Sequence, residues 1–109
     1  QLQQVALNLI MNAAEAMSRN SPEERRVILR TEATDARAKV SVRDFGEGIA
    51  PENRNRLFQP FFTTKGSGLG MGRAISKSII EAHGGRIWAE NHPERGAIFL
   101  FELPTLKPE

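Results

Sequence analysis

The segment from Gly66 to Gly72 restricts most strongly what this chain can fold into. It has a glycine at every second position and leads directly into a stretch with the apolar spacing of a helix. Residues 63–70 contain too many small side chains for a regular helix or strand, so we expect a loop there. Closely spaced glycines let backbone N–H groups converge, and a helix start adds partial positive charge. The segment therefore fits a phosphate-binding loop, and it fits equally a flexible linker before an amphipathic helix with a solvated basic face.

The charges around this segment are distributed unevenly. From Arg54 through Ile80 there are five basic residues and no acidic residue. The whole chain has 15 Lys and Arg against 13 Asp and Glu, which gives a formal net charge of +2. Such a small excess gives little reason to expect nucleic acid as a partner, because its binding requires extensive neutralisation of phosphates. The local basic stretch favours an anion site instead.

The length of 109 residues allows one domain, residues 1–109, and excludes a multidomain enzyme that acts by itself. The absence of cysteine excludes disulfides, thiolate metal sites and thiol nucleophiles, and it fits a reducing, cytoplasmic location. The longest strictly apolar run, Ala97–Phe101, is far too short to cross a membrane. Because the N-terminus also lacks the pattern of a signal peptide, we expect no membrane contact from this segment.

The spacing of apolar residues predicts the order of the secondary structure elements. One long helix is expected over residues 2–17, and a second from Leu69 or Met71 to His83, where Gly84 and Gly85 end it. Pro51 suits the first turn of a shorter helix that runs to about Phe58. Four short segments predict two hairpins: residues 27–34 with 38–44, and residues 86–91 with 97–103. This order predicts an α/β (α+β) two-layer sandwich, with helices packed on one face of a mixed β-sheet.

The first expected helix carries polar residues beside its apolar face. At about 100° per residue, one narrow stripe holds Asn8, Asn12, Glu15 and Arg19. An Asn amide oxygen is a suitable ligand for Mg²⁺, which is a hard cation that prefers oxygen. For an isolated pair of Asn residues, an ordinary polar helix surface is the simpler explanation, so a metal site needs support from the rest of the chain.

Asp44 lies at the end of an expected strand and is followed by Gly46 and Gly48. These glycines allow a ligand to approach the backbone closely, and the carboxylate could accept a hydrogen bond from an exocyclic amine such as that of adenine. A turn residue that caps the strand end is the alternative. Downstream, Phe58, Phe61 and Phe62 surround Pro60 and are either core residues or a hinge for a loop.

Three familiar nucleotide-binding motifs are absent. A P-loop requires a lysine after its glycines, whereas Lys65 precedes them. No register of these glycines gives the dinucleotide pattern Gly-x-Gly-x-x-Gly. The tripeptide Asp44-Phe45-Gly46 matches a metal-binding motif of eukaryotic-type protein kinases, but their other motifs are missing.

Taken in order, four motifs resemble the ATP-binding catalytic domain of bacterial sensor histidine kinases. This domain has a Bergerat-type fold and belongs to an ATPase superfamily that includes gyrase-type topoisomerases. The motifs are similar to the N box, the first glycine box, the F box and the second glycine box, in that order: Asn8–Ala14, Asp44–Ile49, Phe58–Lys65 and Gly66–Met71. The order Phe-Phe-Thr-Thr-Lys is similar to nitrogen-regulation and oxygen-sensing kinases in particular. Because the chain starts directly at the N-box helix, the resemblance implies an N-terminally truncated fragment of a larger kinase.

The resemblance implies a role for each matched position. Asn12 would ligate a Mg²⁺ ion that bridges the phosphates of ATP, and Asn8 would line the site one turn earlier. Asp44 would bind the adenine amine, while Gly46 and Gly48 would admit the base and ribose. Arg56 would lie near the γ-phosphate and stabilise charge during transfer. The remaining implied ATP-binding residues are Ile49, Phe58, Thr64, Lys65, Gly66, Ser67, Gly68, Leu69, Gly70 and Met71.

One position bears on the type of reaction. Members of the superfamily that hydrolyse ATP resemble Glu-x-x-x-Asn in the first helix, where the Glu activates water. Asn8 stands at that first position and cannot act as a general base, which favours transfer to a protein nucleophile. His83 and His92 flank turns and do not resemble phosphoacceptors. The resemblance therefore implies a histidine on a separate dimerisation domain as partner and, indirectly, a response regulator; a nucleotide-dependent interaction module without transferase activity is the alternative.

Overall fold

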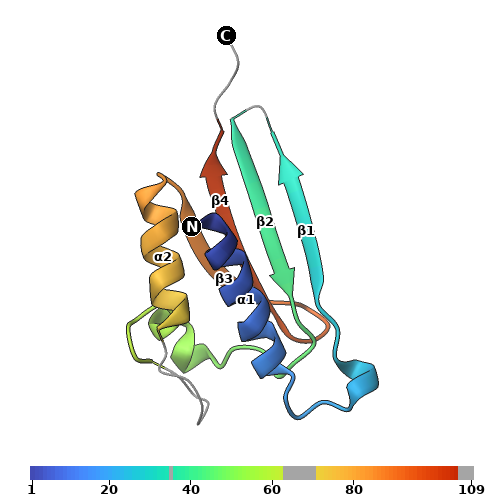
Figure 1. Cartoon of the computed structure of the whole chain (residues 1–109). Coiled ribbons are helices and arrows are strands. Elements are labelled where there is room, and N and C mark those ends of the chain that lie inside the picture. The colour runs from blue at the N-terminus through green and yellow to red at the C-terminus, as the bar shows by residue number, and fades with distance from the viewer. Residues whose placement is uncertain (35, 63–70, 106–109) are drawn as a thin grey trace.

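A computed structural model describes residues 1–34, 36–62 and 71–105 of this chain. The predicted elements occur in the expected order, and their ends differ from the expected ones by no more than three residues, whereas a short 3₁₀ helix at residues 22–24 was not expected (Figure 1). They are α1 (Leu2–Ala16), the 3₁₀ helix η1 (Pro22–Glu24), β1 (Ile28–Ala33), β2 (Arg37–Arg43), the 3₁₀ helix η2 (Pro51–Arg56), α2 (Gly72–Ala82), β3 (Arg86–Asn91) and β4 (Ala97–Pro104). The short helix expected after Pro51 is the 3₁₀ helix η2.

The four strands form one sheet in the order β1-β2-β4-β3. The two-layer sandwich is confirmed, but the sheet that we expected to be mixed is antiparallel at each of the three pairings among the described residues. The helical connection from β2 leads to β3, which does run parallel to β2. Since β4 lies between these two strands and opposes both, no parallel pair forms.

Both long helices pack on the same face of the sheet and run in opposite directions (Figure 1). On α1 the buried residues follow one helical stripe, Val5, Leu9 and Ala13, while α2 contributes Ile80. These side chains pack against Val42, Phe99 and Phe101 of the two central strands. The spacing of about four residues along each helix is what turns its apolar side toward the sheet.

The chain segments that surround the candidate site lie at one end of the sandwich. The C-terminal ends of α1, β2 and β3 lie there together with the N-terminal ends of α2 and β4 (Figure 1). At the opposite end α2 stops as predicted, because Gly84 adopts a φ of 78° and Gly85 N–H bonds to the Ile80 carbonyl at 3.0 Å. Among the described residues, no helix is long and apolar enough to cross a membrane.

Candidate functional site

A pocket of about 680 Å³, measured with its solvent-facing part, opens at this end of the molecule. It lies between the C-terminal end of α1, the segment after β2 and the start of α2. Its wall combines polar groups with apolar side chains: Asn12, Glu15, Asp44 and Arg73 with Ile49, Leu57, Phe62 and Phe99. A concave site of this composition, with a few polar groups in an apolar wall, is typical of small-molecule binding.

Asp44 is the most deeply buried acidic residue described, with 1% of its surface exposed. Its Oδ1 atom accepts hydrogen bonds from the N–H groups of Gly46 at 2.9 Å and Ala97 at 3.2 Å. Its Oδ2 atom is buried and has no hydrogen-bond partner among the described residues. A buried acceptor without a partner costs free energy, so this oxygen is a position that a donor on a ligand would satisfy.

Two glycines fix the backbone around Asp44 by close approach. A Cβ atom on Gly46 would collide with the carbonyl oxygen of Ala16, and one on Gly96 would collide with the carbonyl of Asp44. Gly46 therefore allows the segment after β2 to pass against the end of α1, and it is not among the residues that line the pocket. Gly48, which the sequence also predicted, does line it.

Asn91, at the end of β3, holds the next part of the same segment. Its amide donates to the Ile49 carbonyl at 3.0 Å and accepts from the Ile49 N–H at 2.7 Å. This pair of bonds fixes Ile49 in the pocket wall. Sequence reasoning missed Asn91, because an asparagine before a His-Pro turn resembles an ordinary strand end.

Arg73 lies at the start of α2 and connects three parts of the pocket. Its guanidinium donates to Asn12 Oδ1 at 2.6 Å, to the Leu57 carbonyl at 2.7 Å and to the Phe62 carbonyl at 3.0 Å. Burial lowers the pKa of Arg73 below its ordinary value, and the negative charge of Glu15 partly opposes that change. In the sequence, Arg73 is one of the five basic residues between Arg54 and Ile80, and its place directly after the glycine-rich segment is the one signal of its role.

Several predicted site residues do not line the pocket. The Asn8 amide donates to the Gly72 carbonyl and to Ser76 Oγ, each at 3.3 Å, and so joins α1 to α2. Phe58 packs edge-on against Phe99 with ring centroids 6.1 Å apart, as a core residue would.

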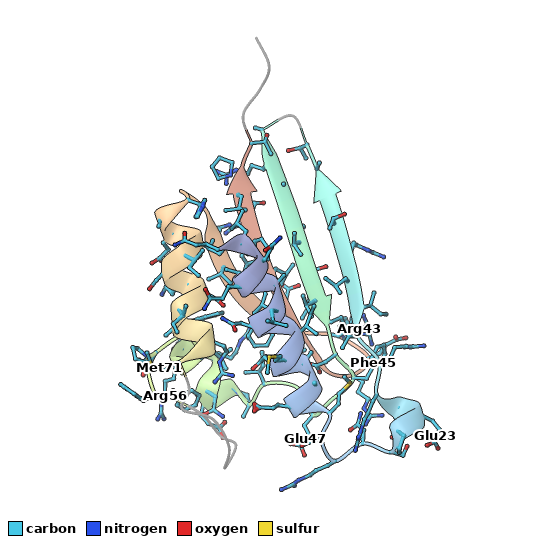
Figure 2. The ribbon with its side chains drawn as sticks, viewed as in Figure 1. Glu23, Arg43, Phe45, Glu47, Arg56 and Met71 are labelled. Carbon is cyan, nitrogen blue, oxygen red and sulfur yellow. The ribbon has the colours of Figure 1, made fainter. Side chains whose placement is uncertain are left out.

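Arg56 and Met71 lie near the lower end of α2 in Figure 2. The Arg56 guanidinium covers the Phe62 ring at 4.6 Å from its centroid, and Met71 is the N-cap residue of α2. Seven further predicted residues lie outside the described part of the chain: Thr64, Lys65, Gly66, Ser67, Gly68, Leu69 and Gly70.

Known proteins resemble this chain over nearly its whole length. Residues 1–107 match the family described as histidine kinase-, DNA gyrase B-, and HSP90-like ATPase. The sensor protein FixL of Bradyrhizobium diazoefficiens is 50% identical over 105 residues, which are 96% of this chain and 21% of that protein. Sporulation kinase A of Bacillus subtilis is 40% identical over 95% of this chain and 16% of its own length. The chain thus spans about a fifth of the length of these curated relatives, or less.

Solved structures agree in fold. The catalytic domain of the histidine kinase ThkA superposes with a TM-score of 0.82 and is 40% identical, covering 94% of this chain and 65% of that one. Full-length ShkA, solved in complex with AMPPNP, gives a TM-score of 0.82 at 35% identity over 98% of this chain and 22% of that one. The fold is therefore that of a histidine kinase catalytic domain. The chain belongs to the histidine kinase-, DNA gyrase B-, and HSP90-like ATPase family.

Proposed function

We propose that this domain binds Mg·ATP in the pocket and donates the γ-phosphate to a histidine on a separate dimerisation domain. The observation that carries the proposal is the buried, unpartnered Oδ2 of Asp44, a residue that lines the pocket. A carboxylate oxygen in this environment selects a ligand that brings an N–H donor, and the exocyclic amine of adenine is such a donor. Ile49 and Phe99 supply the apolar walls that an aromatic base requires.

Asn12 is the residue that fits a magnesium ion. Asn12 lines the pocket, and its Oδ1 atom accepts one hydrogen bond from Arg73 and retains a second lone pair. Over the described ranges there is no cluster of three or more His, Cys, Asp or Glu residues that could hold a metal. The other ligands of the ion would therefore be phosphate oxygens and water, which suits Mg²⁺. Bound there, Mg²⁺ would neutralise charge on the phosphates.

Arg56 is proposed to stabilise the charge of the transferred phosphoryl group. Its guanidinium packs on the ring of Phe62, and Phe62 lines the pocket. Arg56 is also exposed, so it can reach a ligand at the open side of the pocket. A cation at this position would act where negative charge is shared between donor and acceptor.

Asn8 supports transfer in preference to hydrolysis. Its amide bonds to Gly72 and Ser76 of α2, and it has no basic group that could activate water.

The two histidines of the chain also support a phosphate acceptor outside this domain. His83 Nδ1 lies 2.8 Å from the Ile79 carbonyl, and His92 Nδ1 accepts the Glu94 N–H at 3.1 Å, so both rings take part in local turns. Because ThkA was solved in complex with a response regulator, we extend the proposal to a response regulator as the later phosphate acceptor.

The test combines this domain, a dimerisation-domain fragment of a related kinase, and ATP labelled at the γ-phosphate. We expect label on the fragment as acid-labile, base-stable phosphohistidine, and we expect the Asp44→Asn variant to transfer less. Measurable ATP binding with no phosphohistidine from any matched fragment would overturn the transfer step. It would favour a nucleotide-dependent interaction module in its place.

A further inference from the structure

Arg73 has a contact pattern that neither the core nor the predicted motifs require. Its guanidinium reaches from α2 to α1 through Asn12, and to the segment after η2 through the carbonyls of Leu57 and Phe62. The side chain lines the pocket together with Asn12 and Phe62. Three hydrogen bonds at 2.6 to 3.0 Å hold the positive charge at one place in the pocket wall.

The acceptors of these three bonds are all uncharged oxygen atoms. Neutral acceptors offset the desolvation of a cation less well than an anion does. The carboxylate of Glu15, which also lines the pocket, offsets part of this desolvation, and the guanidinium remains protonated. A partly buried guanidinium in a pocket wall is thus a position where a bound anion gains a strong interaction.

The hydrogen-bonding capacity of the Arg73 guanidinium also favours binding of an anion. A guanidinium has five N–H donors in a fixed fork, and the described residues accept from three of them. The bond to Leu57 uses Nε, so Nη1 and Nη2 each keep one N–H for a ligand. Two such donors match the oxygens of a phosphate, which arginine binds in a bidentate manner.

We propose that Arg73 is a phosphate-binding residue of the nucleotide site and that it holds the α- or β-phosphate beside Asn12. This inference rests on the proposed binding of ATP. It also predicts that Asn12 takes a cation only with nucleotide present. A Mg²⁺ ion on Oδ1 without phosphates would face a guanidinium at hydrogen-bond distance from the same oxygen, and the two positive charges would repel each other.

The competing explanation is that Arg73 only ties α1 to the segment after η2. A purely structural tie would affect every ligand of the pocket equally, whereas a phosphate contact distinguishes ligands by their phosphates. Binding of adenosine, AMP, ADP and ATP therefore separates the two explanations. Calorimetry with Mg²⁺ would measure these four ligands on the wild type, Arg73→Gln, Arg73→Lys and the control Arg54→Gln. Arg54 is exposed on η2 and does not line the pocket, so Arg54→Gln removes the same charge elsewhere.

We expect Arg73→Gln to weaken ADP and ATP about tenfold or more, while adenosine changes by less than about twofold. The ATP affinity of Arg73→Lys should lie between those of the wild type and Arg73→Gln, because lysine keeps the positive charge but lacks the planar fork of N–H donors. Equal losses for adenosine and ATP, or unchanged ATP affinity, would overturn the inference. If the wild type binds none of the four ligands, the proposed function itself fails, which is a separate result.

A second measurement uses the wild type and does not depend on a variant that folds. The side-chain Nε–H signal of Arg73 in a nitrogen–proton correlation spectrum should move when ATP is added and stay in place when adenosine is added. Inorganic triphosphate should move the same signal at higher concentration. A signal that responds to adenosine and ATP alike would again assign Arg73 a structural role only.

Discussion

The two ends of the pocket are held by different means. At the Asp44 end, defined by Asp44, Gly46, Ile49, Asn91 and Gly96, glycine contacts and paired hydrogen bonds to the main chain fix the wall. At the Arg73 end, defined by Asn12, Phe62 and Arg73, one long side chain makes the connections. The Asp44 end is therefore fixed largely by main-chain contacts, whereas the Arg73 end depends on the hydrogen bonds of one side chain.

The backbone next to Phe62 supports this contrast. Phe61 has a φ of 67°, which makes it the one non-glycine residue in the left-handed region among those the structure describes. Its side chain is 70% exposed, so packing does not explain the conformation. A bulky residue in this region stores strain of roughly 1–3 kcal/mol. The strained residue and Arg73 therefore lie at the same end of the pocket.

The largest expected effect comes from Gly96→Ala at the Asp44 end. The added Cβ would collide with the Asp44 carbonyl while the residue also keeps a φ of 84°. We expect a loss of about 3 kcal/mol or more in the free energy of unfolding, measured with urea. Gly84→Ala is the matched control: φ is 78° there, but the nearest atom is Pro104 Cγ at 3.6 Å, so we expect only about 1 kcal/mol. Equal losses for the two variants would show that the contact with Asp44 is not rigid.

Asp44→Asn tests the ligand role of the same end. With the amide oxygen in place of Oδ1, the bonds from Gly46 and Ala97 remain, and a donor replaces the unpartnered Oδ2. We expect ATP and adenosine to lose affinity equally, by about 1–3 kcal/mol, because both carry the adenine amine. Calorimetry measures this, with the exposed Glu52→Gln as control. Wild-type affinity in Asp44→Asn would remove the carboxylate from the adenine site.

The sequence predicted much of the fold because helix and strand periodicity is a local signal. Val5, Leu9 and Ala13 are the buried stripe that their spacing indicates, and Gly84 ends α2 as expected. Strand order is a different matter. Whether the sheet is mixed or antiparallel depends on which strand of the second hairpin, β3 or β4, pairs with β2, and nothing in the local pattern of either strand specifies it.

The site was predictable to the extent that its residues follow motifs. Asp44, Asn12 and Ile49 were named from the sequence and do line the pocket. Arg73 and Asn91 were not named, because their roles arise from partners far along the chain. Arg73 is 61 residues from Asn12, and Asn91 is 42 residues from Ile49. Such pairings are set by packing of the two layers and have no spacing rule.

Asn12→Ala tests the Arg73 end and should have a moderate effect. It removes the amide oxygen that accepts from Arg73 and that we propose as the Mg²⁺ ligand. We expect ATP affinity at saturating Mg²⁺ to fall by about 1–2 kcal/mol, and affinity in EDTA to remain nearly unchanged. Titrations of ATP with and without Mg²⁺ measure the difference, and the exposed Asn55→Ala serves as control. An identical metal dependence in wild type and variant would exclude Asn12 as a ligand.

Asn8→Ala should have the smallest effect of the four substitutions. It tests whether the Arg73 end of the pocket depends on the contact between α1 and α2. The change removes two hydrogen bonds of 3.3 Å between the helices and leaves the buried Ser76 hydroxyl without this donor. We expect the free energy of unfolding to fall by about 0.5–1.5 kcal/mol, and ATP affinity to change by less than about twofold. Thermal or urea unfolding and calorimetry on the same samples measure both quantities. If Asn8→Ala instead weakened ATP as much as Asn12→Ala does, the register of α1 on α2 would control the pocket. The Arg73 end would then depend on the helix interface rather than on the contacts of one arginine.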